Sequence, residues 1–244
     1  MTITHISDTH GQHANLQIPT CDVLIFSGDY SAGKGNLADL LDFLGWFEQQ
    51  SAKLRLFVAG NHDLVLDKQE AQKHKAAGNT FGYLRALEGY TSAQDLIKNY
   101  NVTYLCNTGV NYEGLTFYGS PITPSFHRET WAFNADRGEE ICKYWNGIPS
   151  TTNVLITHGP PYGILDVTTN QKGDAYEHAG CQDLMNVIKK RLFSLKLCCF
   201  GHLHEQFGVV QRPVSNTRNC LFSNGAVLTD RHKLLITEPL IITI

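Results

Sequence analysis

Short apolar runs alternate along this chain with stretches that carry glycine and polar side chains. The run at residues 23–26 has four apolar residues in a row, which is typical of a strand covered on both faces. Runs of this kind predict strands at 2–7, 22–27, 54–59, 154–157 and 197–200. Apolar residues with helical spacing predict a helix over 36–50, which Asn36 can cap. This alternation of strand, helix and strand favours a parallel sheet with right-handed crossovers.

The second half of the chain is richer in predicted strands. Glu113 and Gly114 form the predicted turn of a hairpin into a strand at 115–119, and helices are expected at 137–145 and 180–192. Four strand-like runs then follow one another at 207–210, 220–223, 233–237 and 240–244. Short connections imply antiparallel pairing, so we expect an α/β fold with a mixed or two-sheet core.

Residues 1–244 are expected to form a single domain with a helical insertion at about 64–100. The insertion has a charged helical piece near 68–77, a second predicted helix at 92–100 and no recognisable ligand motif. It is interpreted either as a peripheral insertion or as a lid over a neighbouring site, because long loops often close over active sites.

Five of the predicted strands end on side chains that can bind metal ions or transfer protons. These side chains are Asp8, His10, Asp29, Asn61, His62, Asp63, His158, His202 and His204. Taken singly, each motif can be structural, since an Asn or Asp in such a place often caps a helix. In open α/β sheets, however, the ligand site lies beyond the carboxyl ends of the strands. Five such endings therefore predict one shared pocket.

The spacing of these residues favours metal binding. Asp8 and His10 lie two residues apart in an extended segment and point to the same side, and His202 and His204 have the same spacing. The candidate ligands are too many for one ion with open positions, so we expect two ions that share the Asp29 carboxylate. Two ions about 3.5–4 Å apart can activate a water and hold both oxygens of an in-line displacement, which favours hydrolysis of phosphate esters.

Taken in order, these motifs resemble the calcineurin-like metallophosphoesterases across nearly the whole chain. The matching motifs are Asp8-x-His10, Gly28-Asp29, Gly60-Asn61-His62-Asp63, His158 and Gly201-His202-x-His204. The resemblance implies a two-sheet mixed β-sandwich flanked by helices. It implies a first metal position formed by Asp8, His10, Asp29 and His204, and a second formed by Asp29, Asn61, His158 and His202. It also makes His62 the catalytic histidine near the leaving oxygen, with Asp63 either orienting its ring or capping a helix.

Further segments are similar to the brain-expressed metallophosphoesterase-domain proteins and, through them, to class III cyclic-nucleotide phosphodiesterases. These segments are Tyr118-Gly119-Ser120-Pro121, Trp131-Ala132-Phe133-Asn134 and residues 157–166. The similarity implies hydrolysis of phosphodiesters, with cyclic nucleotides or similar small esters as substrates. The protein-phosphatase branch continues its Gly-Asp motif with Asp and Arg, whereas Tyr30 and Ser31 follow here, so phosphoprotein substrates are disfavoured.

Other functions remain as alternatives. A phosphomonoesterase of the same fold and a metal-binding scaffold without catalysis both fit the motifs. Residues 28–34 also match the GxxxxGK pattern of a phosphate-binding loop. That loop needs a Ser or Thr hydroxyl for magnesium where this chain has Gly35, and Asp29 would face the phosphates. The nucleotide-hydrolase interpretation is therefore the weakest of the three.

Composition narrows the class of protein further. The net charge of −3 and the lack of any block of five basic residues argue against binding to long nucleic acids. The 7 cysteines are odd in number and show no CxxC spacing, so we expect reduced thiols. No apolar run approaches the ~20 residues of a membrane span, and the first residues are too polar for a signal peptide. We therefore expect a soluble, cytoplasmic protein with a small phosphate ester as its partner.

The types of ligand limit which metals can bind. Mixed imidazole and carboxylate ligands suit Mn, Fe, Co, Ni or Zn, and Mn is favoured. The remaining histidines have no partner spacing and are interpreted as surface or core residues: His5, His13, His74, His127, His178 and His232. His127 and Arg128 lie in a loop with Phe126 and Trp131, where an aromatic ring can stack on a base and Arg128 can meet a phosphate.

Overall fold

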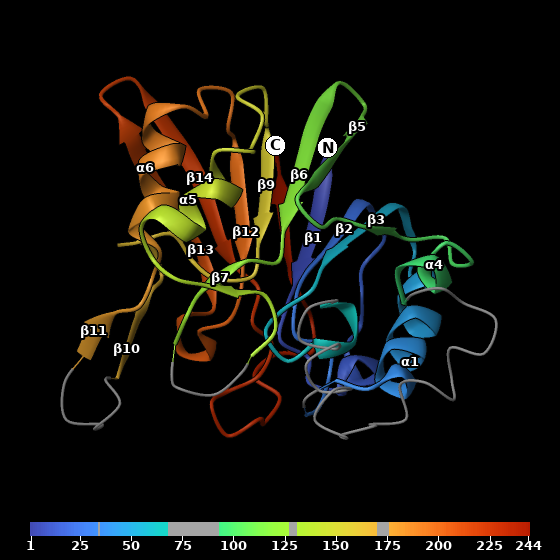
Figure 1. The fold of residues 1–244 in the computed structure, drawn as a ribbon. Coiled ribbons are helices and arrows are strands. Elements are labelled where there is room, and N and C mark those ends of the chain that lie inside the picture. The colour runs from blue at the N-terminus through green and yellow to red at the C-terminus, as the bar shows by residue number, and fades with distance from the viewer. Residues whose placement is uncertain (34, 68–92, 127–130, 170–175) are drawn as a thin grey trace.

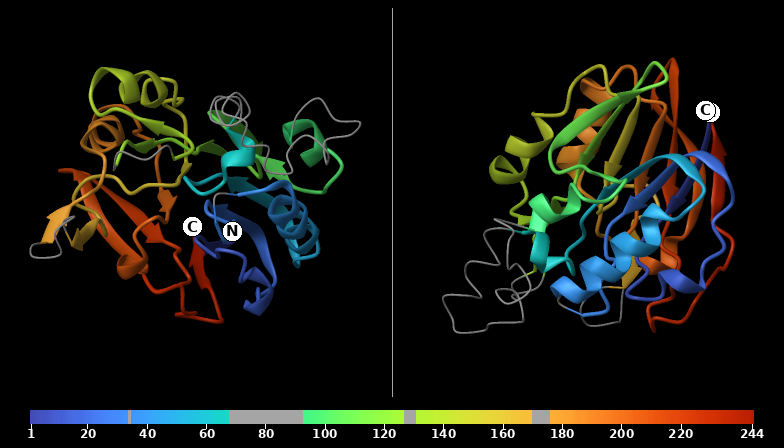
Figure 2. Two further views of the ribbon diagram at one scale, coloured as in Figure 1. Left: turned by 60° about the horizontal axis from the view of Figure 1, so that its bottom comes forward. Right: turned by 90° about the vertical axis from the view of Figure 1, so that its right-hand side faces the viewer.

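Two β-sheets that pack face to face form the centre of the molecule in a computed structural model, and helices lie on their outer sides (Figure 1; Figure 2). The structure describes residues 1–33, 35–67, 93–126, 131–169 and 176–244. The predicted two-sheet α/β sandwich is confirmed. None of the helices in the described part of the chain has the length and apolar character that crossing a bilayer requires.

The first sheet has 5 strands in the order β15-β1-β2-β3-β4. Its parallel strands are β1 (Thr2–Ile6), β2 (Cys21–Ser27), β3 (Ala52–Val58) and β4 (Thr103–Tyr104), and β15 (Leu240–Thr243) pairs antiparallel with β1. The crossover from β2 to β3 contains α1 (Leu37–Glu48). The side chain of Asn36 accepts a hydrogen bond from the backbone N–H of Asp39 at 3.0 Å, so the predicted helix cap is confirmed.

The second sheet has 6 strands in the order β13-β14-β12-β9-β6-β5. Its strands are β5 (Thr108–Tyr112), β6 (Leu115–Ser120), β9 (Val154–Thr157), β12 (Leu197–Phe200), β13 (Gly208–Ser215) and β14 (Arg218–Asn224). The four inner strands are parallel to one another, and β5 and β13 pair antiparallel at the two edges. Glu113 and Gly114 have φ of 48° and 77° and form the predicted hairpin turn, because a two-residue turn of this type needs positive φ at both positions.

Shorter elements complete the described chain. They are α4 (Ala93–Ile97), α5 (Glu139–Trp145), α6 (Gln182–Lys190), the 3-10 helices η1 (His13–Asn15), η2 (Leu64–Leu66) and η3 (His204–Gln206), and the strand pairs β7 (Thr123–Pro124) with β8 (Asn134–Ala135) and β10 (Val167–Thr169) with β11 (Tyr176–His178).

Two predictions need comment. The predicted strand at 233–237 is wrong: Leu234 forms only an isolated bridge with Leu228, because this segment folds back across a tight turn and joins neither main sheet. The helical piece near 68–77 and most of the segment interpreted as a lid lie outside the described residues, as do His74, His127 and Arg128. The assignment of the whole chain to a single domain stays a prediction.

Apolar packing holds the two sheets together and brings their ends to one edge. Side chains from both sheets meet in a buried layer: Ile3, Val23, Ile25, Val58, Phe117, Val154, Ile156 and Leu197. A second apolar cluster covers the outer faces, where α1 contributes Leu40, Phe43 and Phe47. The carboxyl ends of β1, β2, β3, β9 and β12 lie at the same edge of the sandwich (Figure 1).

Candidate metal centre

The loops that follow these five strands are tied to one another by hydrogen bonds from backbone N–H groups. The N–H of Asp8 donates to the carbonyl of Gly28 at 2.9 Å, and the N–H of His10 donates to the carbonyl of Asp29 at 3.1 Å. In the second sheet the N–H of Gly201 donates to the carbonyl of His158 at 2.9 Å. The N–H of His202 then joins the sheets by donating to Oδ2 of Asp8 at 2.9 Å. The loop after β3 joins these four where the N–H of His62 donates to Oδ1 of Asp29 at 2.8 Å, so all five loops are connected.

Four of the predicted ligands have left-handed backbone conformations. The φ angles are 54° for Asp8, 42° for His10, 61° for Asp29 and 71° for His202. Residues other than glycine adopt such angles at some cost in energy, and outside turns these positions cluster at functional sites, where the surrounding structure enforces the conformation. These four residues with positive φ follow the ends of strands, where the sequence predicts the metal ligands.

The first group of side chains is centred on His10 and His204. Their Nε2 atoms lie 3.3 Å apart, and Nε2 of His204 lies 3.5 Å from Oδ1 of Asp8. Each ring donates through Nδ1 to a backbone carbonyl, His10 to Ser31 at 3.0 Å and His204 to Thr229 at 3.1 Å. Burial alone would lower the pKa of His204, but the hydrogen bond and charge of Asp8 raise it to about 9, so that Nε2 of His204 carries a hydrogen that lies between the two rings. Once that hydrogen is lost, the two facing Nε2 atoms are both acceptors, and a metal ion can take its place. Two ligands about 2.0–2.1 Å from a tetrahedral ion would be about 3.3–3.4 Å apart, so this pair fits a transition metal.

The second group is centred on His158, which is fully buried. Its Nδ1 donates to the carbonyl of Ser27 at 2.9 Å, and its Nε2 lies 3.0 Å from Oδ1 of Asn61 and 3.3 Å from Oδ2 of Asp29. The ring of His202 meets the ring of His158 edge to face at 5.1 Å. One ligand atom each from Asp29, His158 and His202 lies within 4.8 Å of the other two, which is close enough for one ion.

Asp29 belongs to both groups. Its Oδ1 accepts the backbone N–H of His62 at 2.8 Å, which leaves Oδ2 to face the imidazoles. Oδ2 lies 3.3 Å from Nε2 of His158 on one side and 3.9 Å from Nε2 of His10 on the other. A single carboxylate oxygen thus lies between the two groups, whereas Oδ1 is held by the backbone of His62.

The charges of the site favour cations at both positions. Burial alone would raise the pKa of Asp8, but the hydrogen bond from His204 and the nearby charges of His158 and His204 outweigh it and lower the pKa to about 2. Burial alone would lower the pKa of His158, but the charge of Asp29 raises it to about 9. Burial and the neighbouring His158 lower the pKa of His202 to about 4, so that ring is neutral and able to bind a metal. Without metal ions, protonated imidazoles balance the buried carboxylates.

His62 is half-buried and lies beside His10. Its Nδ1 donates to the carbonyl of Gly33 at 2.7 Å, and its ring contacts the rings of His10 and Trp131 at 4.8 Å and 4.6 Å between centroids. One nitrogen of His62 lies within 4.8 Å of ligand atoms of His10 and Asp29. The ring is therefore close enough to reach a group bound beside them.

Asp63 has a different place from the one expected. Its buried carboxylate accepts backbone N–H groups from Gly60 at 2.7 Å, Asp29 at 2.9 Å and Ser31 at 3.2 Å. It forms no side-chain cap for η2, and the ring of His62 pairs with Gly33 instead. Burial and the charge of Asp29 raise the pKa of Asp63 to about 8, against the opposing effect of the Gly60 and Ser31 N–H donors and the charge of His158. Asp63 joins the loops after β2 and β3.

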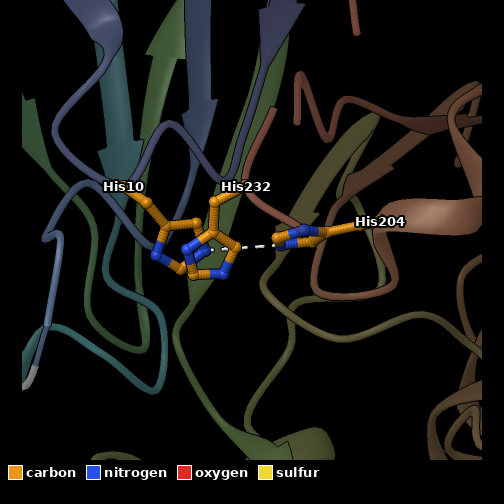
Figure 3. A group of neighbouring side chains, drawn as sticks. All are labelled: His10, His204 and His232. Carbon is orange, nitrogen blue, oxygen red and sulfur yellow. Dashed lines mark hydrogen bonds between the residues drawn. The ribbon is translucent and has the colours of Figure 1, made fainter. Parts of the chain in front are cut away.

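One residue near the predicted metal ligands has no signal in the sequence. His232 lies far along the chain from the last motif, yet its ring stacks on that of His10 and faces His204 (Figure 3). A pocket of about 430 Å³ opens beside these residues and is lined by Phe126, Thr168, Thr169, Glu177, Ala179, His202, Leu203, His204, Glu205, Asp230 and His232. A volume of this size suits a small-molecule ligand.

Comparison with known proteins agrees with this geometry. Residues 1–206 match the family model described as calcineurin-like phosphoesterase. A Caenorhabditis elegans protein named UPF0046 protein K07C11.7 is 34% identical over 241 residues, which cover 99% of this chain and 74% of that protein. The human metallophosphoesterase domain-containing protein 1 is 35% identical over 208 residues, which cover 84% of this chain. The match spans only 61% of the length of that human protein.

Proposed function

The chain belongs to the calcineurin-like phosphoesterase family, a family of metal-dependent phosphoester hydrolases, and we propose that it hydrolyses phosphodiesters with two metal ions. The observation that carries the proposal is the position of Asp29. Its Oδ2 lies 3.3 Å from His158 and 3.9 Å from His10, so two groups of ligands share one carboxylate. Such a pair of ions lowers the pKa of a bound water. It also stabilises the attacking and the leaving oxygen during displacement at phosphorus.

The proposed ligands divide into two sets that meet at Asp29. The first set is Asp8, His10, Asp29 and His204, and the second is Asp29, Asn61, His158 and His202. We propose manganese as the metal, with iron, zinc, cobalt and nickel as the other ions that suit mixed nitrogen and oxygen ligands. Hydrogen bonds from Nδ1 of His10, His158 and His204 to backbone carbonyls would hold each Nε2 toward its ion.

His62 is the proposed proton donor to the leaving oxygen. Because the carbonyl of Gly33 holds the hydrogen on Nδ1, a protonated His62 presents its second N–H, on Nε2, away from Gly33. A nitrogen of this ring lies within 4.8 Å of ligand atoms of His10 and Asp29. Asp63 acts indirectly in this proposal, because it fixes the loops that carry Asp29 and His62.

The pocket beside the metal ligands supports a diester with a small leaving group. Glu177, Glu205 and Asp230 line it, and their carboxylates would repel the second negative charge of a phosphomonoester more than the single charge of a diester. The rings of Phe126 and Trp131 are stacked at 6.2 Å between centroids and would offer a surface for a nucleobase. We therefore propose cyclic nucleotides or similarly small diesters as the substrate class.

A substrate screen tests the proposal. The manganese-loaded protein is assayed against cyclic nucleotides, bis-nitrophenyl phosphate and nitrophenyl phosphate under the same conditions. Faster turnover of the diesters is expected. If the monoester reacts faster by orders of magnitude, the protein is a phosphomonoesterase and the diesterase proposal is wrong. Stoichiometric metal with no turnover of any ester would identify a metal-binding scaffold without catalysis.

We also propose a reducing, cytoplasmic location for the protein, which rests on 7 cysteines that are all free.

A further inference from the structure

A tight turn at residues 229–233 places His232 over the candidate metal centre. The N–H of Thr229 donates to the carbonyl of Lys233 and the N–H of His232 donates to the carbonyl of Thr229, both at 2.8 Å. His232 has a φ of 51°, a left-handed position that such three-residue turns commonly give to glycine. The side-chain amide of Gln12 donates to the carbonyl of His232 at 2.8 Å and ties the turn to the loop after β1.

The same turn supports the first group of ligands from two sides. The carbonyl of Thr229 accepts Nδ1–H of His204 at 3.1 Å, which orients that ring. The ring of His232 stacks on the ring of His10 with centroids 4.6 Å apart and an angle of 9° between planes (Figure 3). One nitrogen from each of His10, His204 and His232 lies within 4.8 Å of the other two. His232 also lines the pocket beside His202 and His204.

The contacts of His232 distinguish it from a metal ligand. Histidines that bind metals usually donate their other ring N–H to a carbonyl or carboxylate, as His10 and His204 do. Neither ring nitrogen of His232 forms a hydrogen bond with the described residues; only its backbone groups do. The ring planes of His10 and His232 are also nearly parallel, so their lone pairs lie in two separate planes and do not converge on one ion. The ring is exposed and available to a bound group.

We propose that His232 is a further substrate-binding residue, whose ring N–H donates a hydrogen bond to an oxygen of the phosphoryl group held beside His10 and His204. The inference rests on the proposed function, because it takes that group as the substrate. An imidazole N–H to a phosphate oxygen is a charge-assisted bond, and such bonds are stronger than those between neutral groups. Stacking on His10 would fix the plane of the ring before the substrate arrives.

Inorganic phosphate is the probe that tests this role. Its affinity for the manganese-loaded protein is measured by calorimetry for the wild type, His232→Phe and His232→Asn, and bound manganese is counted in each. Phenylalanine keeps the stacked ring without the donor, and asparagine suits the left-handed turn without the ring. Both variants are expected to keep two ions and to bind phosphate about tenfold more weakly. His178→Asn is the matched control: it removes an exposed ring outside the pocket, its amide can still donate to Oδ1 of Asp166, and it should bind phosphate as the wild type does.

Other results would overturn the role. Wild-type phosphate affinity in His232→Phe, with or without a loss in His232→Asn, would reduce His232 to a stacking partner of His10. Loss of an ion in His232→Phe would make it a metal ligand instead. If the wild type binds two ions and phosphate but hydrolyses no ester, the proposed function fails while the phosphate contact stands. If the wild type hydrolyses diesters and His232→Phe binds phosphate normally, only this inference fails.

Discussion

His5 gives the sharpest test of how the two sheets are joined. Its ring is fully buried on β1, where Nδ1 lies 2.7 Å from Oγ of Ser223 on β14 and Nε2 lies 2.9 Å from Oγ of Ser27 on β2. Burial lowers the pKa of His5 from 6.5 to about 3, although the charge of Asp8 acts to raise it. The carbonyl of Ser27 in turn accepts Nδ1–H of His158, so the ring also supports the candidate metal centre.

The size of the effect follows from this shift in pKa. Below pH 6.5 the imidazole of the unfolded chain takes up a proton, whereas folded His5 stays neutral until the pH approaches 3. The unfolded state therefore binds more protons between these values, and the free energy of unfolding falls as the pH falls. The slope approaches 1.4 kcal/mol per pH unit, so His5 should remove about 2 kcal/mol of stability between pH 7 and pH 5.

Urea unfolding of the EDTA-treated protein at pH 7, 6 and 5 measures this loss. Other histidines of the site titrate in the same range, so the result is the difference between the wild type and His5→Gln, which can still bond to a serine hydroxyl. The variant should lose about 2 kcal/mol less than the wild type over this range. Ser223→Ala, the control, lowers stability but keeps the imidazole and the wild-type slope. Parallel curves for the wild type and His5→Gln would refute the reasoning.

Three more substitutions test the candidate site. His62→Ala should keep both ions and lower kcat by about 10²–10⁴-fold on esters with poor leaving groups, with a smaller loss on nitrophenyl esters. Equal losses on both esters would contradict a role at the leaving oxygen. Asp29→Asn should lower bound metal below two ions per chain in elemental analysis, and two retained ions would exclude the bridge. Gly60→Ala should lower the melting temperature and metal content, because its Cβ would lie 2.2 Å from Oδ1 of Asp29. Gly45→Ala, which meets no atom within 4 Å in α1, should instead raise the free energy of unfolding by about 0.5–1 kcal/mol. A melting temperature for Gly60→Ala at or above that of Gly45→Ala would contradict the packing argument.

Local patterns along the chain were enough to predict much of this fold. The inner strands are buried on both faces, so each is a continuous apolar run that predicts a strand. The capping residue Asn36 predicts the start of α1. The turn at Glu113 and Gly114 was predictable because its positive φ angles depend on two neighbouring residues. The segment 233–237 has the same apolar character but joins neither main sheet. Propensity could not reveal this, since strand formation depends on a partner elsewhere in the chain.

The chemistry of the candidate site was also readable in the sequence, because each side chain directly follows a strand. Parallel strands deliver their carboxyl ends to one edge, so Asp8, Asp29 and His158 could be grouped before their distances were known. Tertiary structure alone decided the rest. His232 reaches His10 through a turn distant in sequence, Asp63 bonds to backbone groups of other loops, and His5 joins two sheets. Local spacing determines which side chains a strand presents, whereas contacts between distant segments depend on how the sheets pack.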